Sequence, residues 1–348
     1  MRINFLVLVD TVSAYRVKKK QIGQLRSVFF ICALCHASSV YSQISVSSHG
    51  MSLTIATQNL FRFYDADDDP SRRDSVLTPA SFQKKIEKTA WYISHKFGCP
   101  DIVAVQEVEN INVLKHLAAE ACWEQHSYAV YLLEGNDFSG MDVGFLLSKK
   151  LKVRHVRQLG LNARQKGKKA RVFDRPPLLL ELANTWCGIE NINLVVVHNR
   201  SFKGLRNPDK SKRVHEKRMQ QAAWLGEWVK SWEKSQPGGA LILLGDFNAL
   251  SGGEELKRLQ KTATNGRRSL LNNLGSQIPE AERYFYIFRG NKQAIDHIFV
   301  TDNLASLVSD VHYTRFNTVW GSSKTRAKRI SDHEGMVAKF DFSDCEVL

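Results

Sequence analysis

The chain has 348 residues, of which 43% are hydrophobic and 24% are charged, and its formal net charge is +14. The apolar run at residues 28–35 is too short to span a membrane, and the four cysteines after residue 42 lack the spacing of a zinc or thiol-redox site. Membrane insertion and cysteine chemistry are therefore excluded as functions, whereas the positive charge suits a polyanionic partner.

The N-terminus has the order of an export signal. Lys18–Lys20 and Arg26 precede the apolar run, and the small and polar residues 37–42 follow it. This pattern predicts that residues 1–42 are an N-terminal extension with a signal peptide cleaved after Ser42, and that residues 43–348 are a single secreted or periplasmic domain. Because the segment before Lys18 is unusually long for a signal, we expect the true start near residue 20. The alternative is a disordered tail of a cytosolic enzyme.

Further along the chain, apolar runs and helical periodicity alternate. The predicted strands are 53–58, 102–106, 128–133, 142–148, 151–157, 178–183, 192–198, 240–245, 294–301 and 335–342. The predicted helices are Pro79–Phe97, Asn110–Ala121, Lys212–Lys234 and Glu254–Gln260. The third helix carries an apolar stripe that we interpret as a core face, formed by Trp224, Leu225, Trp228 and Trp232. These predicted helices and strands, taken alone, indicate one large domain of mixed α and β structure.

Several strands end or begin at acidic, amide or imidazole groups. The run 241–244 stops at Gly245, Asp246 and Asn248, and comparable groups adjoin other strands. These groups are Asn59, Glu107, His198, Asp296 with His297, and Ser331–His333. A single Gly-Asp step is ordinary turn chemistry, but strand ends on a rigid sheet can bring side chains together on a substrate. The recurrence indicates one catalytic site, and because its members must meet, one domain.

The order of these groups resembles the endonuclease/exonuclease/phosphatase superfamily typified by deoxyribonuclease I, over roughly residues 52–342. The stretches 106–110, 141–144, 245–249 and 295–299 look like its bacterial secreted or nuclease-like members. Leu244 and Ala294–His297 differ from the Trp and the Pro-Ala-Trp-Cys-Asp-Arg motif of the inositol polyphosphate 5-phosphatases. The resemblance implies an α+β, four-layer αββα sandwich of two mixed sheets flanked by helices.

Phosphodiester hydrolysis explains the residue types. A cation must offset charge on the phosphoryl oxygens, and Mg²⁺ prefers hard oxygen ligands. We expect Mg²⁺ as the cofactor, with Mn²⁺ or Ca²⁺ as alternatives. Glu107 is the first choice of ligand, with Asn59 and Asp332 as secondary or water-mediated ligands.

Five residues are predicted to carry the reaction. Asp246 would activate water, and Asn248, two residues along the same side of an extended chain, would hold a phosphate oxygen. His333 would face the scissile phosphate while Asp296 orients it and stabilises its protonated form. By resemblance, His198 either protonates the leaving oxygen or binds the phosphate. Whether Asp246 or His333 accepts the proton of the attacking water stays open.

Other candidates have structural interpretations of equal or greater weight. Asp142 either closes a turn or contacts substrate or His198. Arg175 is expected to pack across the central sheet, and Arg218 to pair within the scaffold. His297 is expected to point away from Asp296 into the interior. The remaining histidines considered are read as structural or solvated: His95, His116, His126 and His215.

Basic residues gather near the predicted site. Residues 1–42 hold six basic residues and one acidic residue, so residues 43–348 keep a net charge of +9. Basic runs cover 149–157, 164–171, 203–213 and 324–329, and two of them adjoin predicted site residues. Arg200, Lys203 and Arg329 are therefore candidate substrate-binding residues, for nucleic-acid backbones read without sequence preference.

Four cysteines remain after residue 42, namely Cys99, Cys122, Cys187 and Cys345. Their even number suits an oxidising compartment, but the sequence leaves their pairing open, with Cys99–Cys122 as one candidate.

The sequence thus predicts a metal-dependent phosphodiester hydrolase, a low-specificity nuclease acting on DNA or RNA or both. We expect a monomer with no protein partner and no stable membrane insertion. The main alternative is a phospholipid phosphodiesterase, because sphingomyelinases share the Asp-His-Ile step; such an enzyme should expose an apolar loop, for which residues 284–288 are a candidate that looks more like a strand. A binding module without catalysis would be expected to lack one of the predicted catalytic residues.

Overall fold

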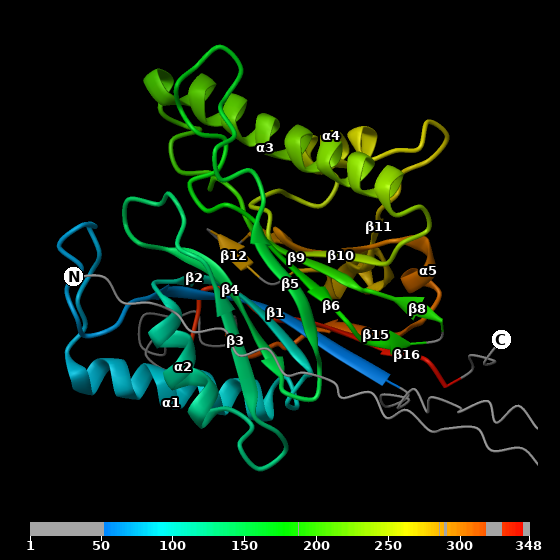
Figure 1. Cartoon of the computed structure of the whole chain (residues 1–348). Coiled ribbons are helices and arrows are strands. Elements are labelled where there is room, and N and C mark those ends of the chain that lie inside the picture. The colour runs from blue at the N-terminus through cyan, green and yellow to red at the C-terminus, as the bar shows by residue number, and fades with distance from the viewer. Residues whose placement is uncertain (1–51, 187, 285, 289–290, 318–328, 344–348) are drawn as a thin grey trace, which may run out of the picture. The chain divides into compact units, whose positions relative to one another are not determined.

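A computed structural model describes residues 52–343 except 187, 285, 289–290 and 318–328 (Figure 1). The predicted signal peptide, Cys187, Cys345 and most of the basic run 324–329 lie outside the described residues.

Two six-stranded sheets form the centre of the described part. In order across the first sheet, the strands are β15 (Val308–Tyr313), β16 (Met336–Asp341), β1 (Ser52–Phe63), β2 (Ile102–Val108), β4 (Asp142–Ser148) and β3 (Tyr128–Leu132). Across the second they are β11 (Asn272–Asn273), β14 (Asp296–Val300), β10 (Leu241–Asp246), β9 (Asn193–His198), β6 (Leu178–Leu182) and β5 (Val153–Gln158). Both sheets are mixed, as predicted.

Each sheet has one parallel pair at its centre, with antiparallel pairing on both sides. The parallel pairs are β1 with β2 and β9 with β10. Because the carboxyl ends of two parallel strands lie at the same sheet edge, each pair delivers two strand ends to one place. The four polar strand ends predicted from sequence belong to these four strands.

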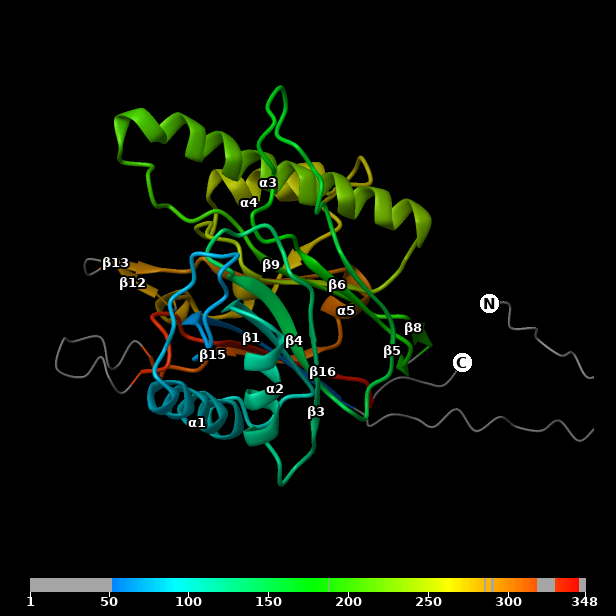
Figure 2. The same ribbon diagram turned by 60° about the vertical axis from the view of Figure 1, so that its left-hand side comes forward.

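Helices cover the outer faces of both sheets. α1 (Pro79–His95) and α2 (Ile111–Glu120) lie on the first sheet, and α3 (Pro208–Ser235) and α4 (Glu254–Thr262) lie on the second (Figures 1 and 2). The short elements are α5 (Asp302–Ala305), two 3₁₀ turns (Leu274–Gln277 and Glu280–Glu282), and the hairpins β7 (Thr185–Trp186) with β8 (Ile189–Glu190) and β12 (Tyr286–Phe288) with β13 (Asn291–Gln293). The α+β, four-layer αββα architecture is confirmed.

Three apolar clusters hold these layers together. One lies between the sheets, where Ile55, Phe145 and Leu244 are fully buried. A second packs the first sheet against α1 and α2, and a third packs the second sheet against α3 and α4. Central strands are therefore buried on both faces, which is why their sequences read as continuous apolar runs.

Helix boundaries follow from capping residues. The Thr78 side chain accepts a hydrogen bond from the Ser81 amide, and Pro79 opens α1. Asn207 caps α3 in the same way, so that this helix starts at Pro208 rather than at Lys212. Within α3, Leu225 and Trp232 are buried, which confirms the predicted core stripe.

Cys99 and Cys122 form a disulfide with their Cα atoms 5.5 Å apart, which confirms the candidate pair. Each has left-handed backbone, with φ of 55° and 58°. The bridge joins the segments that follow α1 and α2 on the same outer layer.

Candidate active site

The two parallel pairs meet across the sheets. Asn59 Nδ2 donates to Glu107 Oε1 within the first sheet and to Asp246 Oδ2 of the second, both at 3.1 Å. His198 Nε2 lies 3.5 Å from Asp246 Oδ2 and 3.8 Å from Glu107 Oε1. The predicted strand-end residues Asn59, Glu107, His198 and Asp246 are thus one contiguous group.

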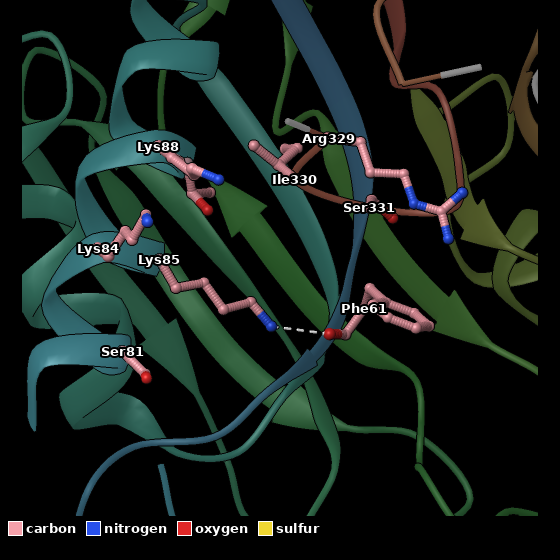
Figure 3. Close-up of a pocket in the computed structure, with 9 residues that line it drawn as sticks. Phe61, Ser81, Lys84, Lys85, Lys88, Arg329, Ile330 and Ser331 are labelled. Atoms are coloured by element: carbon pink, nitrogen blue, oxygen red, sulfur yellow. Dashed lines mark hydrogen bonds between the residues drawn. The ribbon is translucent and has the colours of Figure 1, made fainter. Parts of the chain in front are cut away.

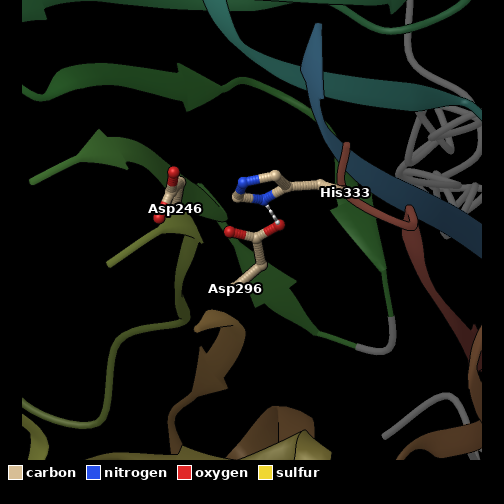
Figure 4. Close-up of side chains that lie close together, drawn as sticks. All are labelled: Asp246, Asp296 and His333. Atoms are coloured by element: carbon tan, nitrogen blue, oxygen red, sulfur yellow. Dashed lines mark hydrogen bonds and ion pairs between the residues drawn. The ribbon is translucent and has the colours of Figure 1, made fainter. Parts of the chain in front are cut away.

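Asp296 and His333 lie beside Asp246 (Figure 4). Asp296 opens β14, which pairs with β10 so that Asp296 faces Asp246 in register. His333 precedes β16, and its Nδ1 lies 2.9 Å from Asp296 Oδ2. Its backbone amide donates to Ser331 Oγ. The carboxylate therefore fixes the ring so that Nε2 is left to face the site.

The backbone turns sharply at the end of β10. Gly245 has φ of 126°, and an added Cβ there would lie 2.3 Å from the Val197 carbonyl oxygen. Asn248 has φ of 49°, and its amide donates to Asp246 Oδ1 at 2.8 Å. The expectation of an extended chain from Asp246 to Asn248 is wrong, because the chain makes an Asx turn there, in which the Asp246 carboxylate accepts from the Asn248 amide.

The side chain of Asn248 is already engaged by the scaffold. Its Nδ2 donates to the Asn199 backbone carbonyl at 3.1 Å, and the backbone carbonyl of Asn248 accepts from the buried guanidinium of Arg218. Arg218 also bonds Glu255 on α4 and the Arg200 carbonyl. This confirms that Arg218 pairs within the scaffold, and it ties α3 and α4 to two loops that carry site residues.

Glu107 also has left-handed backbone, with φ of 57°. Its Oε2 accepts from the Arg62 amide at 2.8 Å, while Asn59 Oδ1 accepts from the Phe61 amide at 2.9 Å. Phe61 and Arg62 are themselves left-handed, with φ of 51° and 53°. The bulge at the end of β1 thus orients both predicted metal ligands, and strain of this kind is typical of functional sites.

Burial and neighbouring charges control protonation here. Burial alone would lower the pKa of His333, but Asp296, Asp246 and Asp332 outweigh it and raise the pKa to about 10. Burial, the Arg175 charge and the His333 charge instead hold the pKa of His198 well below its usual value. The two imidazoles are therefore of opposite character, His333 cationic and His198 neutral.

The two buried aspartates crowd one another. Burial and the charge of Asp296 raise the pKa of Asp246 well above its usual range, and burial likewise raises that of Asp296. Ligand atoms of Asp246, Asp296 and His333 all lie within 4.8 Å of one another. Among the described residues, Asp296 Oδ1 and Asn199 Oδ1 are buried without a hydrogen-bond partner. The His333 imidazolium offsets part of this repulsion, and beside it Glu107, Asn59 and Asp246 form a contiguous set of hard oxygen donors that fits a divalent metal.

The predicted ligand Asp332 borders this group, with Oδ1 3.9 Å from His333 Nε2. Of the residues assigned to substrate, Asp142 is buried and accepts from the Gly135 amide, so the turn-closing interpretation holds. Burial raises the pKa of Asp142 to about 8. Arg200 donates to Ser201 Oγ and the Lys203 carbonyl, and is committed to its own loop. Lys203 is exposed.

Two interior predictions can also be judged. His297 is fully buried, with Nε2 2.8 Å from the Ala249 carbonyl oxygen, as expected of a side chain pointing inward. Arg175 pairs with Asp137 at 3.3 Å, and its charge reaches His198.

Arg329 lines a pocket that sequence reasoning missed. Figure 3 shows Lys84, Lys85 and Lys88 of α1 facing Phe61 and the segment Arg329–Ser331. The sequence offered little indication of this pocket, because the three lysines lie on a helix and are not next to any of the predicted strand-end residues in the chain.

Residues 54–331 match the model of the endonuclease/exonuclease/phosphatase family. The chain belongs to this family. Family membership makes it a hydrolase of the nuclease and phosphodiesterase type. A search of curated proteins found no match.

Solved structures share the family fold at low identity. Truncated TDP2 from Caenorhabditis elegans is 16% identical, with a TM-score of 0.55, covering 83% of this chain and 97% of that one. A family protein from Bacteroides thetaiotaomicron is 17% identical, with a TM-score of 0.55 and coverage of 85% and 97%. D. rerio TDP2, complexed with a single strand DNA product, is 18% identical, with a TM-score of 0.55 and coverage of 84% and 100%. These likenesses support the fold.

Proposed function

We propose that the protein is a Mg²⁺-dependent nuclease of low sequence specificity that cleaves phosphodiesters of DNA or RNA. One observation carries the proposal: Asn59, Glu107, His198 and Asp246 from four parallel-strand ends meet beside the Asp296–His333 pair. The site therefore combines hard oxygen ligands, a neutral imidazole and a cationic imidazole.

The metal would be held by Glu107, with Asn59 and Asp332 contributing directly or through water, and Asp246 adjoins these ligands through Asn59. A bound divalent ion would neutralise phosphoryl charge and lower the cost of the developing negative charge. Glu107 suits this position because its side chain remains 22% exposed while Asp246 is buried.

The remaining groups have complementary roles. Asp246, the more buried carboxylate, orients the attacking water and accepts its proton, and a bound divalent ion would favour this by lowering the pKa of Asp246. His333 stays protonated against Asp296 and stabilises charge on the phosphate through Nε2. His198, buried and neutral, hydrogen-bonds the phosphate or the leaving oxygen. This arrangement favours Asp246 over His333 as the base.

Nucleic acid is the substrate class that the charge favours. Residues 43–348 carry a formal charge of +9, and the pocket beside the site is lined by four basic residues. Backbone phosphates bind such surfaces without base readout. The single strand DNA product bound to D. rerio TDP2 shows that a protein of this fold can hold nucleic acid.

No specific observation favours the phospholipid alternative. Residues 286–288 form strand β12, paired with β13, instead of an open loop. Within the described residues, none of the helices is both long and apolar enough to cross a bilayer.

We propose secretion or periplasmic export as well, with cleavage after Ser42, and a monomeric enzyme. The Cys99–Cys122 bridge supports export, because disulfides persist in oxidising compartments.

The deciding assay incubates residues 43–348 with supercoiled plasmid, linear DNA, RNA and sphingomyelin vesicles, each with Mg²⁺ or with EDTA. We expect Mg²⁺-dependent nicking or degradation of nucleic acid. Release of phosphocholine with intact nucleic acid would instead move the protein to the phospholipid phosphodiesterases.

Asp246→Asn and His333→Ala locate the activity. Each should lower kcat by several orders of magnitude, because each removes a group that acts on the reacting phosphate. Circular dichroism and thermal unfolding should show an intact fold. Near-normal turnover in either variant would refute its assignment.

A further inference from the structure

A cavity of about 280 Å³ lies beside the candidate active site. α1 forms one wall, and Phe61 and the segment Arg329–Ser331 form the other. Four of the cavity's nine lining residues are basic and none is acidic. In Figure 3 the lysines approach from α1, while Phe61 and Arg329 lie across from them. A cavity lined by cations and by the hydroxyls of Ser81, Thr89 and Ser331 has the chemistry of an anion site.

Both walls of this pocket lead directly into the candidate active site. Phe61 follows Asn59 by two residues, and its amide donates to Asn59 Oδ1. On the other wall, Ser331 Oγ accepts from the amide of His333. The charges of Glu107 and Asp332 reach Lys85. A phosphate in the pocket would therefore neighbour the phosphate undergoing hydrolysis without replacing it.

The lysines have different tasks. Lys85 Nζ donates to the carbonyls of Phe61 and Arg62 at 2.7 and 3.0 Å, and Arg62 in turn donates to Glu107. Lys85 thus positions the strained bulge that orients a predicted metal ligand. Lys84 and Lys88 are one helical turn apart and repel one another, and burial together with Lys84 lowers the pKa of Lys88. An anion between them would relieve that repulsion.

Among the described residues, Lys84 and Arg329 have no carboxylate within ion-pair distance. This contrasts with Lys168 and Lys217, which pair with Glu216 and Asp174 at 2.6 Å. The charges of Lys84 and Arg329 are thus available to a ligand.

We propose that this pocket is a second phosphate subsite, in which Lys84, Lys88 and Arg329 bind a backbone phosphate of the same polynucleotide that is cleaved at the Asp246–His333 site. The inference rests on the proposed nuclease function and deepens it: the substrate is a chain with at least two phosphates. A diester with a single phosphate would reach the catalytic groups but leave the subsite empty.

The test uses the double variant Lys84→Ala/Lys88→Ala. Its control is Lys257→Ala/Lys261→Ala, a pair of exposed lysines with the same four-residue spacing, on α4 over the other sheet. Two substrates are compared, a single-stranded DNA oligonucleotide and bis(p-nitrophenyl) phosphate. A third measurement, fluorescence anisotropy in EDTA, follows binding of a labelled oligonucleotide as salt is varied.

For Lys84→Ala/Lys88→Ala we expect KM for the oligonucleotide to rise about tenfold with little change in kcat. The fall in kcat/KM on the oligonucleotide should therefore exceed any fall in kcat/KM on the small diester by about tenfold. The dependence of log Kd on log salt should become shallower by about one unit or more, as for lost phosphate contacts. The control pair should match the wild type.

Equal losses on both substrates would overturn the subsite, because the lysines would then act through the catalytic centre. Oligonucleotide binding unchanged from the control pair would overturn it too, whatever the activity. If wild-type protein binds the oligonucleotide through these lysines but does not cleave it, the subsite stands and the nuclease proposal fails.

Discussion

The Asp296–His333 pair shows how burial decides what an ordinary contact does. Asp310 and His312 form a chemically equal pair at 2.7 Å on the surface, where their side chains are 55% and 48% exposed. The Asp296 and His333 side chains are 2% and 8% exposed at 2.9 Å. Solvent screens the first pair, whereas the second acts in a low-dielectric interior. The same pair of residue types thus has two different electrostatic outcomes.

Asp296→Asn should therefore expose a pH limit that the wild type lacks. With Asp296 ionised, the pKa of His333 is about 10, so the imidazolium persists through neutral pH. Without that charge the pKa falls toward or below its usual value near 6.5, and the cation is lost as pH rises. We expect kcat to drop about 100-fold at pH 8, with the remaining activity declining from pH 6 upward. A pH profile of kcat from 6 to 9 measures this.

Asp310→Asn is the matched control and should leave both kcat and its pH profile unchanged. If Asp296→Asn keeps the wild-type profile, Asp296 does not stabilise a catalytic imidazolium.

At the scale of the strand, β10 depends on its glycine. Gly245 combines φ of 126° with close approach to β9, so Gly245→Ala adds both backbone strain and a collision with the Val197 carbonyl. We expect a loss of about 3 kcal/mol or more in the free energy of unfolding. Displacement of the adjacent Asp246 should also lower kcat at least tenfold. Urea denaturation and steady-state kinetics test the two effects.

Gly252→Ala separates strain from collision. Gly252 also has positive φ, at 73°, but nothing lies within 4 Å of an added Cβ. That variant should lose about 1 kcal/mol and keep its activity. Equal losses in the two variants would mean that the contact with β9 is unimportant.

A comparison of the predicted and observed strands and turns shows what the sequence could predict. Buried central strands were found from their apolar runs, since burial on both faces leaves a continuous signal. β15 was missed because its run Val308–Tyr313 is short, charged and largely exposed at a sheet edge. The Asx turn that seats Asn248 was missed because side-chain capping of a turn has no periodicity. The pocket lysines required knowledge of how α1 lies against the site, which no local pattern encodes.

At the scale of the whole molecule, the site exists only where the two sheets meet. Asn59 bonds Glu107 in its own sheet and Asp246 in the other, so catalysis depends on packing between sheets. The cluster between the sheets holds that packing with side chains of both, such as Ile55 and Leu244. Loosening this layer would separate the catalytic groups without altering any of them.

The Cys99–Cys122 bridge should instead act on stability alone. Cys99 precedes β2, whereas Glu107 lies near the far end of that strand. Five residues of β2, 102–106, at about 3.3 Å each, lie between the bridge and Glu107. Closing a loop of 23 residues should stabilise the fold by about 2–4 kcal/mol. Reduction by dithiothreitol should therefore lower the urea midpoint while kcat at 25 °C stays unchanged. Cys99→Ser/Cys122→Ser should already have the lower midpoint and should not respond to dithiothreitol; a further drop in that variant would assign the stabilisation to other cysteines.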